Sequence, residues 1–148
     1  MKQLLIIPFH PDDQAAVKQL ILAGLVEHWG FLDPTKNPDL EDIAASYHAG
    51  TFLVARLEEE IVGTGALVPR QAGTAEIVRM SVAQQHRRSG IGRRILAALI
   101  AQARAQGFQR VILETTATWQ EVIEFYLRCG FRITHYQDGD VYFLLELL

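Results

Sequence analysis

The spacing of apolar residues alternates along the chain between periods of about two and about 3.6 residues. Short-period or continuously apolar stretches predict strands at 3–9, 51–57, 61–69, 75–82, 110–115, 131–136 and 141–147. Long-period stretches predict helices at 12–29, 37–50, 90–106 and 118–129. The order βααβββαβαββ favours an α/β (α+β) fold with a single mixed, mostly antiparallel β-sheet and helices on both faces. We expect one domain over residues 1–148.

Cap and turn residues refine some of these boundaries. Asn37 followed by Pro38 predicts the start of the second helix, because proline is favoured at the first helical position. The sequence TWQE at 118–121 fits a capping box that opens the last helix. Gly63 and Gly65 weaken the strand that carries them, which indicates a bulge or close packing there.

Composition and charge place the chain among ordinary globular proteins. Hydrophobic residues make up 49% and charged residues 21% of the sequence. A net charge of −3 and a pI of about 5.9 argue against nucleic acid as a partner. The single cysteine excludes an internal disulfide and favours a reducing, cytoplasmic location. Because no apolar run reaches the roughly 18 residues of a membrane span, and the N-terminal run meets proline and aspartate too early for a signal peptide, no membrane partner is expected.

The most informative stretch is 76–92, EIVRMSVAQQHRRSGIG, together with the helix that follows it. Four of the eight residues at 87–94 are arginine, in a chain that is acidic overall. A strand, a basic turn with glycines and a helix N-terminus form an anion site, because free backbone amides and the helix dipole point into the turn. The pattern therefore predicts a phosphate-bearing ligand.

The motif R-x-x-G-x-G, formed by Arg87, Gly90 and Gly92, resembles the acyl-CoA pyrophosphate loop of the GNAT acyltransferase superfamily. The later motif F-Y-x-x-x-G-F, which begins at Phe125, is similar to a second signature of that superfamily. The resemblance covers roughly residues 52–131. It implies an acyl-CoA N-acyltransferase that transfers an acetyl group from acetyl-CoA (coenzyme A) as co-substrate to a primary amine of a small molecule or peptide. Transfer would be direct, in a ternary complex, with no metal.

Two groups of residues are expected to bind the cofactor. Glycines let the backbone approach phosphate oxygens, and arginines add charge-assisted contacts. The pyrophosphate group would lie on Arg87, Arg88, Ser89, Gly90, Ile91, Gly92 and Arg93. By resemblance, the pantetheine arm would pair with the backbone of Met80, Ser81 and Val82, as an added strand does. An amide of Met80 or Val82, depending on a bulge, would polarise the thioester carbonyl. The alternative is that the arginines form a solvated helix start.

Glu76 is the predicted general base. Strict alternation places it on one strand face with Val78, Met80 and Val82. A carboxylate on an apolar face is desolvated, which raises its pKa toward a range useful for accepting a proton from the amine. The resemblance supports this role. The alternative is a carboxylate at the strand end, paired with an arginine such as Arg79 or Arg70.

Tyr126 is the predicted general acid. By resemblance its hydroxyl would protonate or stabilise the leaving thiolate of coenzyme A. The alternative is a buried tyrosine whose hydroxyl bonds a backbone carbonyl. The sequence departs from the resemblance seven residues earlier, where relatives commonly carry an asparagine that binds the cofactor arm and this chain has Trp119.

The acceptor site is less well specified. By resemblance it lies beside the first two helices, where Trp29, Phe31, Asp33 and Tyr47 are candidates for contacts with the amine. Clustered carboxylates would favour a cationic acceptor, or they would only stabilise helix N-termini. The members of this cluster are Asp33, Asp39, Glu41 and Asp42.

Other classes of function fit the sequence less well. The histidines lack metal-ligand spacing. The absent G-K-[S/T] excludes a P-loop nucleotidase, and a nucleic-acid module would need a wider basic surface. A non-catalytic CoA-binding sensor or interaction domain is the alternative to an enzyme. The apolar stretch 141–148 predicts a homodimer, unless it is buried within the chain's own sheet.

Overall fold

A computed structural model describes residues 3–33 and 35–147. These residues form a seven-stranded sheet in the order β1-β2-β3-β4-β5-β7-β6. Only the β4–β5 pair is parallel. The predicted mixed, mostly antiparallel sheet is therefore confirmed. The strands are β1 (Leu4–Pro8), β2 (Thr51–Leu57), β3 (Glu60–Pro69), β4 (Thr74–Val82), β5 (Arg110–Thr116), β6 (Arg132–Gln137) and β7 (Asp140–Glu146).

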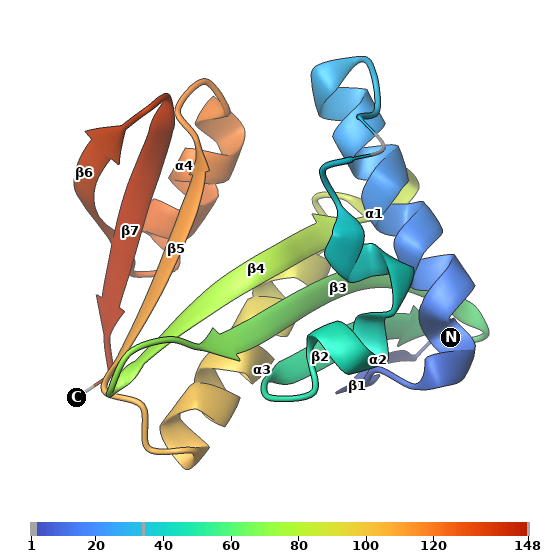
Figure 1. Cartoon of the computed structure of the whole chain (residues 1–148), viewed down its shortest axis with the longest axis horizontal. Helices are drawn as coiled ribbons and strands as arrows, with labels where there is room; N and C mark the ends of the chain where they lie inside the picture. The colour runs from blue at the N-terminus through green and yellow to red at the C-terminus, as the bar shows by residue number, and fades with distance from the viewer. Residues whose placement is uncertain (1–2, 34, 148) are drawn as a thin grey trace.

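Helices cover both faces of the sheet, as predicted (Figure 1). They are α1 (Gln14–Trp29), α2 (Ile43–Ser46), α3 (Ile91–Ala105) and α4 (Gln120–Arg128), joined by 3-10 turns η1 (Pro11–Asp13), η2 (Pro38–Glu41) and η3 (Gln84–His86). One hydrophobic cluster packs α3 and α4 against the sheet, and a second packs α1, η2 and α2 against the opposite face. The alternation of apolar residues in β2 and β3 divides their side chains between the two clusters.

The continuous helix predicted for 37–50 is wrong. The chain forms η2, breaks at Asp42, and then makes the single turn α2. Asp42 adopts an extended backbone and its carboxylate accepts the amide of Ala45, which starts a new helix. The side chain of Gln14 fills the break, because it donates to the carbonyl of Leu40 (2.7 Å) and accepts the amide of Ile43 (3.0 Å).

The capping box predicted at 118–121 is also wrong. Trp119 is the residue at the N-cap of α4, and its side chain accepts no capping hydrogen bond. Glu121 does not reach back to the helix start as the motif requires. Its carboxylate instead pairs with Arg88, 2.8 Å away on the β4–α3 turn.

Both explanations offered for the β3 glycines apply. A Cβ atom on Gly65 would lie 2.7 Å from both the Ile95 side chain and the Met80 sulfur, so close packing of α3 requires glycine. A bulge lies opposite, on β4, where the register passes from Thr64↔Ser81 to Ala66↔Val78. Two residues of β4, Arg79 and Met80, thus face one residue of β3.

The bulge corrects the predicted facing of β4. Strict alternation put Glu76, Val78, Met80 and Val82 on one face. Val78 does pack with the α1 cluster, but Met80 and Val82 pack with the α3 cluster. The extra residue inverts the alternation, so Arg79 points to the α1 and η2 side together with Val78.

The sheet opens between its two parallel strands. Pairing of β4 with β5 ends at Glu76↔Ile112, and Figure 1 shows the two strands diverging beyond that point, with α1 on one side of the opening and α4 on the other. Strand β7 lies between β5 and β6, so both of its edges are paired within the chain. In the part of the chain that the structure describes, no helix is long and apolar enough to span a membrane.

Candidate active site

Two cavities meet where β4 and β5 separate. The larger has a volume of about 850 Å³ and extends from the strands to the β4–α3 turn and along α4. The smaller, about 500 Å³, lies on the α2 side of β4. The residues that line both cavities are Ile77, Val78, Arg79 and Glu114. Molecules bound in the two cavities would therefore come into contact at this junction.

The β4–α3 turn presents a helix start to the larger cavity. Arg88 and Gly90 both have left-handed backbones, with φ of 63° and 86°. Gly90 precedes the first residue of α3, so the free amides of that helix face the turn. Of the residues predicted for the pyrophosphate site, all except Ser89 line the cavity. The Ser89 hydroxyl donates instead to the carbonyl of His86.

The arginines of the turn differ in what they contact. Both terminal nitrogens of Arg87 bond the Glu27 carboxylate on α1, at 2.6 and 2.7 Å, and its Nε donates to the carbonyl of Val82. This pairing lowers the pKa of Glu27. Arg88 and its partner Glu121 are largely exposed, with 83% and 82% of their side-chain surface accessible. An anion can displace such an exposed pair easily, whereas Arg87 also fastens α1 to the end of β4.

Gly90→Ala is expected to lower the free energy of unfolding by about 1 kcal/mol, because an L-residue is strained at positive φ. The same strain would reshape the turn and weaken binding of coenzyme A. Gly107, at the end of α3, has a similar φ of 84° and open space around it, but it lies outside the two cavities. Gly107→Ala is the matched control: urea unfolding should show a similar loss of stability, and calorimetry should show unchanged affinity. Equal affinity of both variants would contradict a ligand role for the turn.

The β4 residues predicted for the pantetheine arm all line the larger cavity: Met80, Ser81 and Val82. Arg79 and Met80 together face the single residue Gly65, so neither has a one-to-one partner in the register with β3. A bulge leaves such backbone groups outside the ladder, where they can bond a ligand. The bulge that the sequence could not place therefore lies at Arg79 and Met80, before Val82.

Tyr126 lies in the wall of the larger cavity. It is 6% exposed and its ring packs against Phe125, Phe131 and Phe143. Burial raises the pKa of its hydroxyl. Among the hydrogen bonds of residues 3–33 and 35–147, none involves this hydroxyl, so the proposed bond to a carbonyl is not observed. The phenol is therefore neutral, and apolar ring contacts hold it in the cavity wall.

Trp119, at the position where the resemblance implies asparagine, packs against the end of α1. Its indole stacks on His28 with ring centroids 4.1 Å apart, and Trp29 lies 5.6 Å away. Both His28 and Trp119 line the larger cavity. Where the resemblance implies a polar side chain, this chain has an aromatic contact that joins the two sides of the opening.

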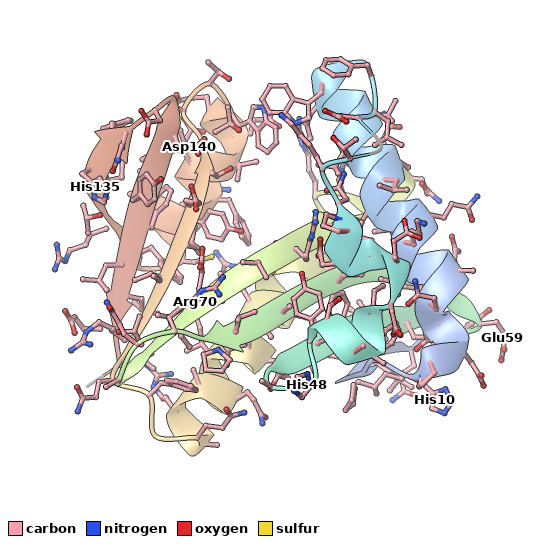
Figure 2. All side chains as sticks on the ribbon, viewed as in Figure 1. His10, His48, Glu59, Arg70, His135 and Asp140 are labelled. Carbon is pink, nitrogen blue, oxygen red and sulfur yellow. The ribbon has the colours of Figure 1, made fainter. Side chains whose placement is uncertain are left out.

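Glu76 lines the smaller cavity and is paired with an arginine. Its Oε1 accepts from Arg70 Nε at 2.7 Å, and 15% of its side-chain surface is exposed. Figure 2 shows Arg70 in the angle between β4 and β5. This is the pairing weighed against the catalytic role. The positive charge of Arg70 compensates the negative charge of Glu76, and the role of Glu76 as general base remains a prediction.

Glu114 is a site residue that the sequence reasoning missed. It follows the point where β5 leaves β4, and it lines both cavities. Partial desolvation of its carboxyl and the neighbouring carboxyl of Asp140 raise the pKa of Glu114, against a smaller lowering by the Tyr142 hydroxyl, although the residue as a whole is exposed. Among the described residues, Glu114 forms no ion pair with a lysine or arginine. A polar residue at the carboxyl end of a predicted parallel strand was the available signal, because ligand sites gather at that edge.

The acceptor candidates separate in space. Tyr47 lines the smaller cavity, and its hydroxyl bonds Asp39 at 2.5 Å. Trp29, Phe31 and Asp33 line neither of the two cavities. Phe31 is 67% exposed, and Asp33 bonds the Thr35 amide and hydroxyl in its own turn.

The carboxylates near η2 also have separate local roles. Asp39 pairs with Arg79, Glu41 pairs with Lys18, and Asp42 caps α2. These three carboxylates therefore already have partners within the chain, which argues against the hypothesis that they bind a cationic acceptor. Within residues 3–33 and 35–147, no group of three or more histidine, cysteine or acidic side chains is arranged to hold a metal ion.

Comparison with known proteins identifies the family. The family model described as "Acetyltransferase (GNAT) family" matches residues 16–131. A probable N-acetyltransferase 14 of Xenopus tropicalis is 32% identical over 103 residues, which are 67% of this chain and 50% of that protein. Human N-acetyltransferase 8 is 30% identical over 112 residues, 70% of this chain and 49% of that protein. The chain belongs to the acetyltransferase (GNAT) family, and it spans about half the length of these relatives.

Solved structures show the same fold. An acetyltransferase of the GNAT family from Staphylococcus aureus Mu50 superposes with a TM-score of 0.90 at 22% identity, covering 99% of this chain and 100% of that chain. The PaiA N-acetyltransferase of Thermoplasma acidophilum, solved in complex with coenzyme A, has a TM-score of 0.86 at 15% identity, covering 97% and 99%. The fold expected from the motifs is thereby confirmed over nearly the whole chain.

Proposed function

We propose that this chain transfers an acetyl group from acetyl-CoA to a primary amine of a small molecule or peptide, directly and in a ternary complex. The observation that carries the proposal is the junction of two cavities at the β4–β5 opening. One cavity ends at the turn predicted to bind an anion, and the other is lined by both polar and apolar side chains. Holding both substrates at one junction supplies proximity and orientation without a covalent enzyme intermediate.

The larger cavity suits coenzyme A. The amides at the start of α3, with Arg88 and Arg93 beside them, would bind the pyrophosphate. Arg87 would contribute through the position of the turn, because its guanidinium is held by Glu27. The backbone at the β4 bulge, which lies outside the one-to-one register with β3, would bind the pantetheine arm and polarise the thioester carbonyl.

Chemistry at the junction needs a proton acceptor and a proton donor. The amine nitrogen forms a bond to the acetyl carbon, the carbon–sulfur bond breaks, and the nitrogen loses a proton. We assign that proton to Glu114, because it lines both cavities and, among the described residues, forms no ion pair with an arginine. Tyr126 would donate its hydroxyl proton to the leaving thiolate. Glu76, held by Arg70, is the alternative proton acceptor from the acceptor side.

The proposal is tested first by binding. Coenzyme A at about 100 times its Kd adds roughly 2.7 kcal/mol of stability, which raises the melting temperature on the order of 5–10 °C for a chain of this size. Thiol release from acetyl-CoA is then followed across a panel of primary amines. An unmoved melting temperature would overturn the proposal. A shift without thiol release for any amine would indicate a CoA-binding sensor instead.

The acceptor and the assembly of the protein lie beyond this proposal. The chain spans about half the length of its relatives, so their activities are not carried over whole. A cytoplasmic location and a homodimer stay predictions from the sequence. A dimer formed by pairing of β7 edges would require β5 or β6 to be displaced.

A further inference from the structure

Arg79 has an unusual backbone at the junction of the two cavities. Its φ is 56°, in the left-handed region that residues with a Cβ atom adopt only at a cost. It is the first of the two residues in the β4 bulge. A left-handed residue in this place persists only when surrounding contacts hold it.

Side chains from η2 and its start supply those contacts. Arg79 Nη2 and Nε bond the two carboxylate oxygens of Asp39 at 2.7 and 3.0 Å, and Nη2 also bonds the side-chain oxygen of Asn37 at 3.1 Å. The buried hydroxyl of Thr64 donates to the Arg79 carbonyl at 2.8 Å. The residue is therefore fixed from both its side chain and its backbone. Two parallel bonds to one carboxylate also fix the orientation of the guanidinium.

Asp39 is itself held in one orientation. The Tyr47 hydroxyl bonds the same oxygen that Arg79 Nε bonds. Burial opposes ionisation of Asp39, but these two partners outweigh it and lower its pKa. Burial and the Asp39 carboxylate raise the pKa of Tyr47 to about 12, so its hydroxyl stays protonated as a donor. Asp39 thus remains a carboxylate across the physiological pH range.

We propose that Asp39 is a positioning residue, which through its ion pair with Arg79 holds the β4 bulge in the left-handed conformation that exposes backbone groups at the junction of the two cavities. This inference rests on the proposed function, because the exposed groups serve the thioester carbonyl. It also gives the short segment η2 a role in catalysis beyond forming a wall of the acceptor cavity.

The test compares glycine and alanine at position 79 when the ion pair is absent. Asp39→Asn removes the charge that holds Arg79 and should lower kcat about tenfold or more, with a smaller effect on KM for acetyl-CoA because the pyrophosphate turn is unaltered. Glycine adopts positive φ without support and alanine does not. The double variant Asp39→Asn/Arg79→Gly should therefore recover about tenfold in kcat over Asp39→Asn/Arg79→Ala. Both doubles lack the same side chain, so only the backbone preference differs.

The controls separate folding from positioning. Glu41→Gln removes the other ion pair of η2, with Lys18, and should leave kcat unchanged. Every variant must keep the melting-temperature rise with coenzyme A. Equal kcat of the two double variants, or an unchanged kcat for Asp39→Asn, would overturn this inference while wild-type transfer still supports the proposed function. Absence of transfer by the wild type would overturn the proposed function and this inference with it.

Discussion

Glu114→Gln is expected to lower kcat/KM for the amine about 100-fold, with the affinity for coenzyme A unchanged. Glu114 lines both cavities, so its carboxylate can reach an amine that attacks at their junction. Glutamine has a similar shape but does not accept a proton. Steady-state kinetics with the best amine of the panel, and calorimetry with coenzyme A, measure the two quantities.

The pH profile distinguishes a base from a binding contact. Partial desolvation and the Asp140 carboxyl raise the pKa of Glu114, outweighing the Tyr142 hydroxyl that lowers it, and only the ionised form accepts a proton. Activity should therefore fall as the pH decreases through this raised pKa, at a higher pH than for an ordinary glutamate. Asp140→Asn removes the neighbouring carboxyl and should move this acidic limb to lower pH, and Glu114→Gln should abolish it.

Glu76→Gln is the matched comparison for the base. If Glu114 accepts the proton, Glu76→Gln changes the rate less and keeps the acidic limb, because Glu76 stays paired with Arg70 in the wild type. Loss of the limb in Glu76→Gln, with the limb retained in Glu114→Gln, would return the role to Glu76. That result would contradict the assignment made from the two cavities.

Tyr126→Phe is expected to lower kcat about 100-fold, because general acid catalysis contributes on this scale. The hydroxyl makes no hydrogen bond with the described residues, so its removal leaves no buried partner unsatisfied. The ring keeps its contacts with Phe131 and Phe143. Stability and the affinity for coenzyme A should thus stay close to those of the wild type.

The control for Tyr126 is a tyrosine far from the site. Tyr136 on β6 is 64% exposed and lies outside both cavities, so Tyr136→Phe should leave kcat unchanged. Thiol release measured at saturating acetyl-CoA reports kcat for both variants. An unchanged kcat for Tyr126→Phe would remove the hydroxyl from the mechanism.

Local patterns in the sequence predicted the order of the strands and long helices. The apolar runs of β2 and β7 appear within a residue of their predicted ends. The glycine at 90 stands where the backbone must be left-handed before α3, and Gly130 does the same after α4. Strand alternation, helix starts and glycine turns depend on near neighbours in the chain, so a sequence reports them directly. The family followed from the same short-range motifs.

Contacts between distant residues decided how the site is built. Arg79 in the bulge is paired with Asp39, 40 residues earlier, and Arg87 is paired with Glu27, 60 residues earlier. Neither pairing has a local signal, since many carboxylates could have matched either arginine. A shift of one residue in β4 reversed the facing of Met80 and Val82, which no alternation pattern reveals.

The stretch 76–92 shows which features depend on local sequence and which depend on contacts between distant residues. The sequence by itself determined the strand, the glycine turn, the helix start and therefore the family, because each depends on backbone preferences over a few residues. Only the tertiary structure decided which carboxylate near the cavity junction is held by a cation, because that depends on which arginines lie nearby. It paired Glu76 with Arg70, whereas Glu114 forms no ion pair among the described residues.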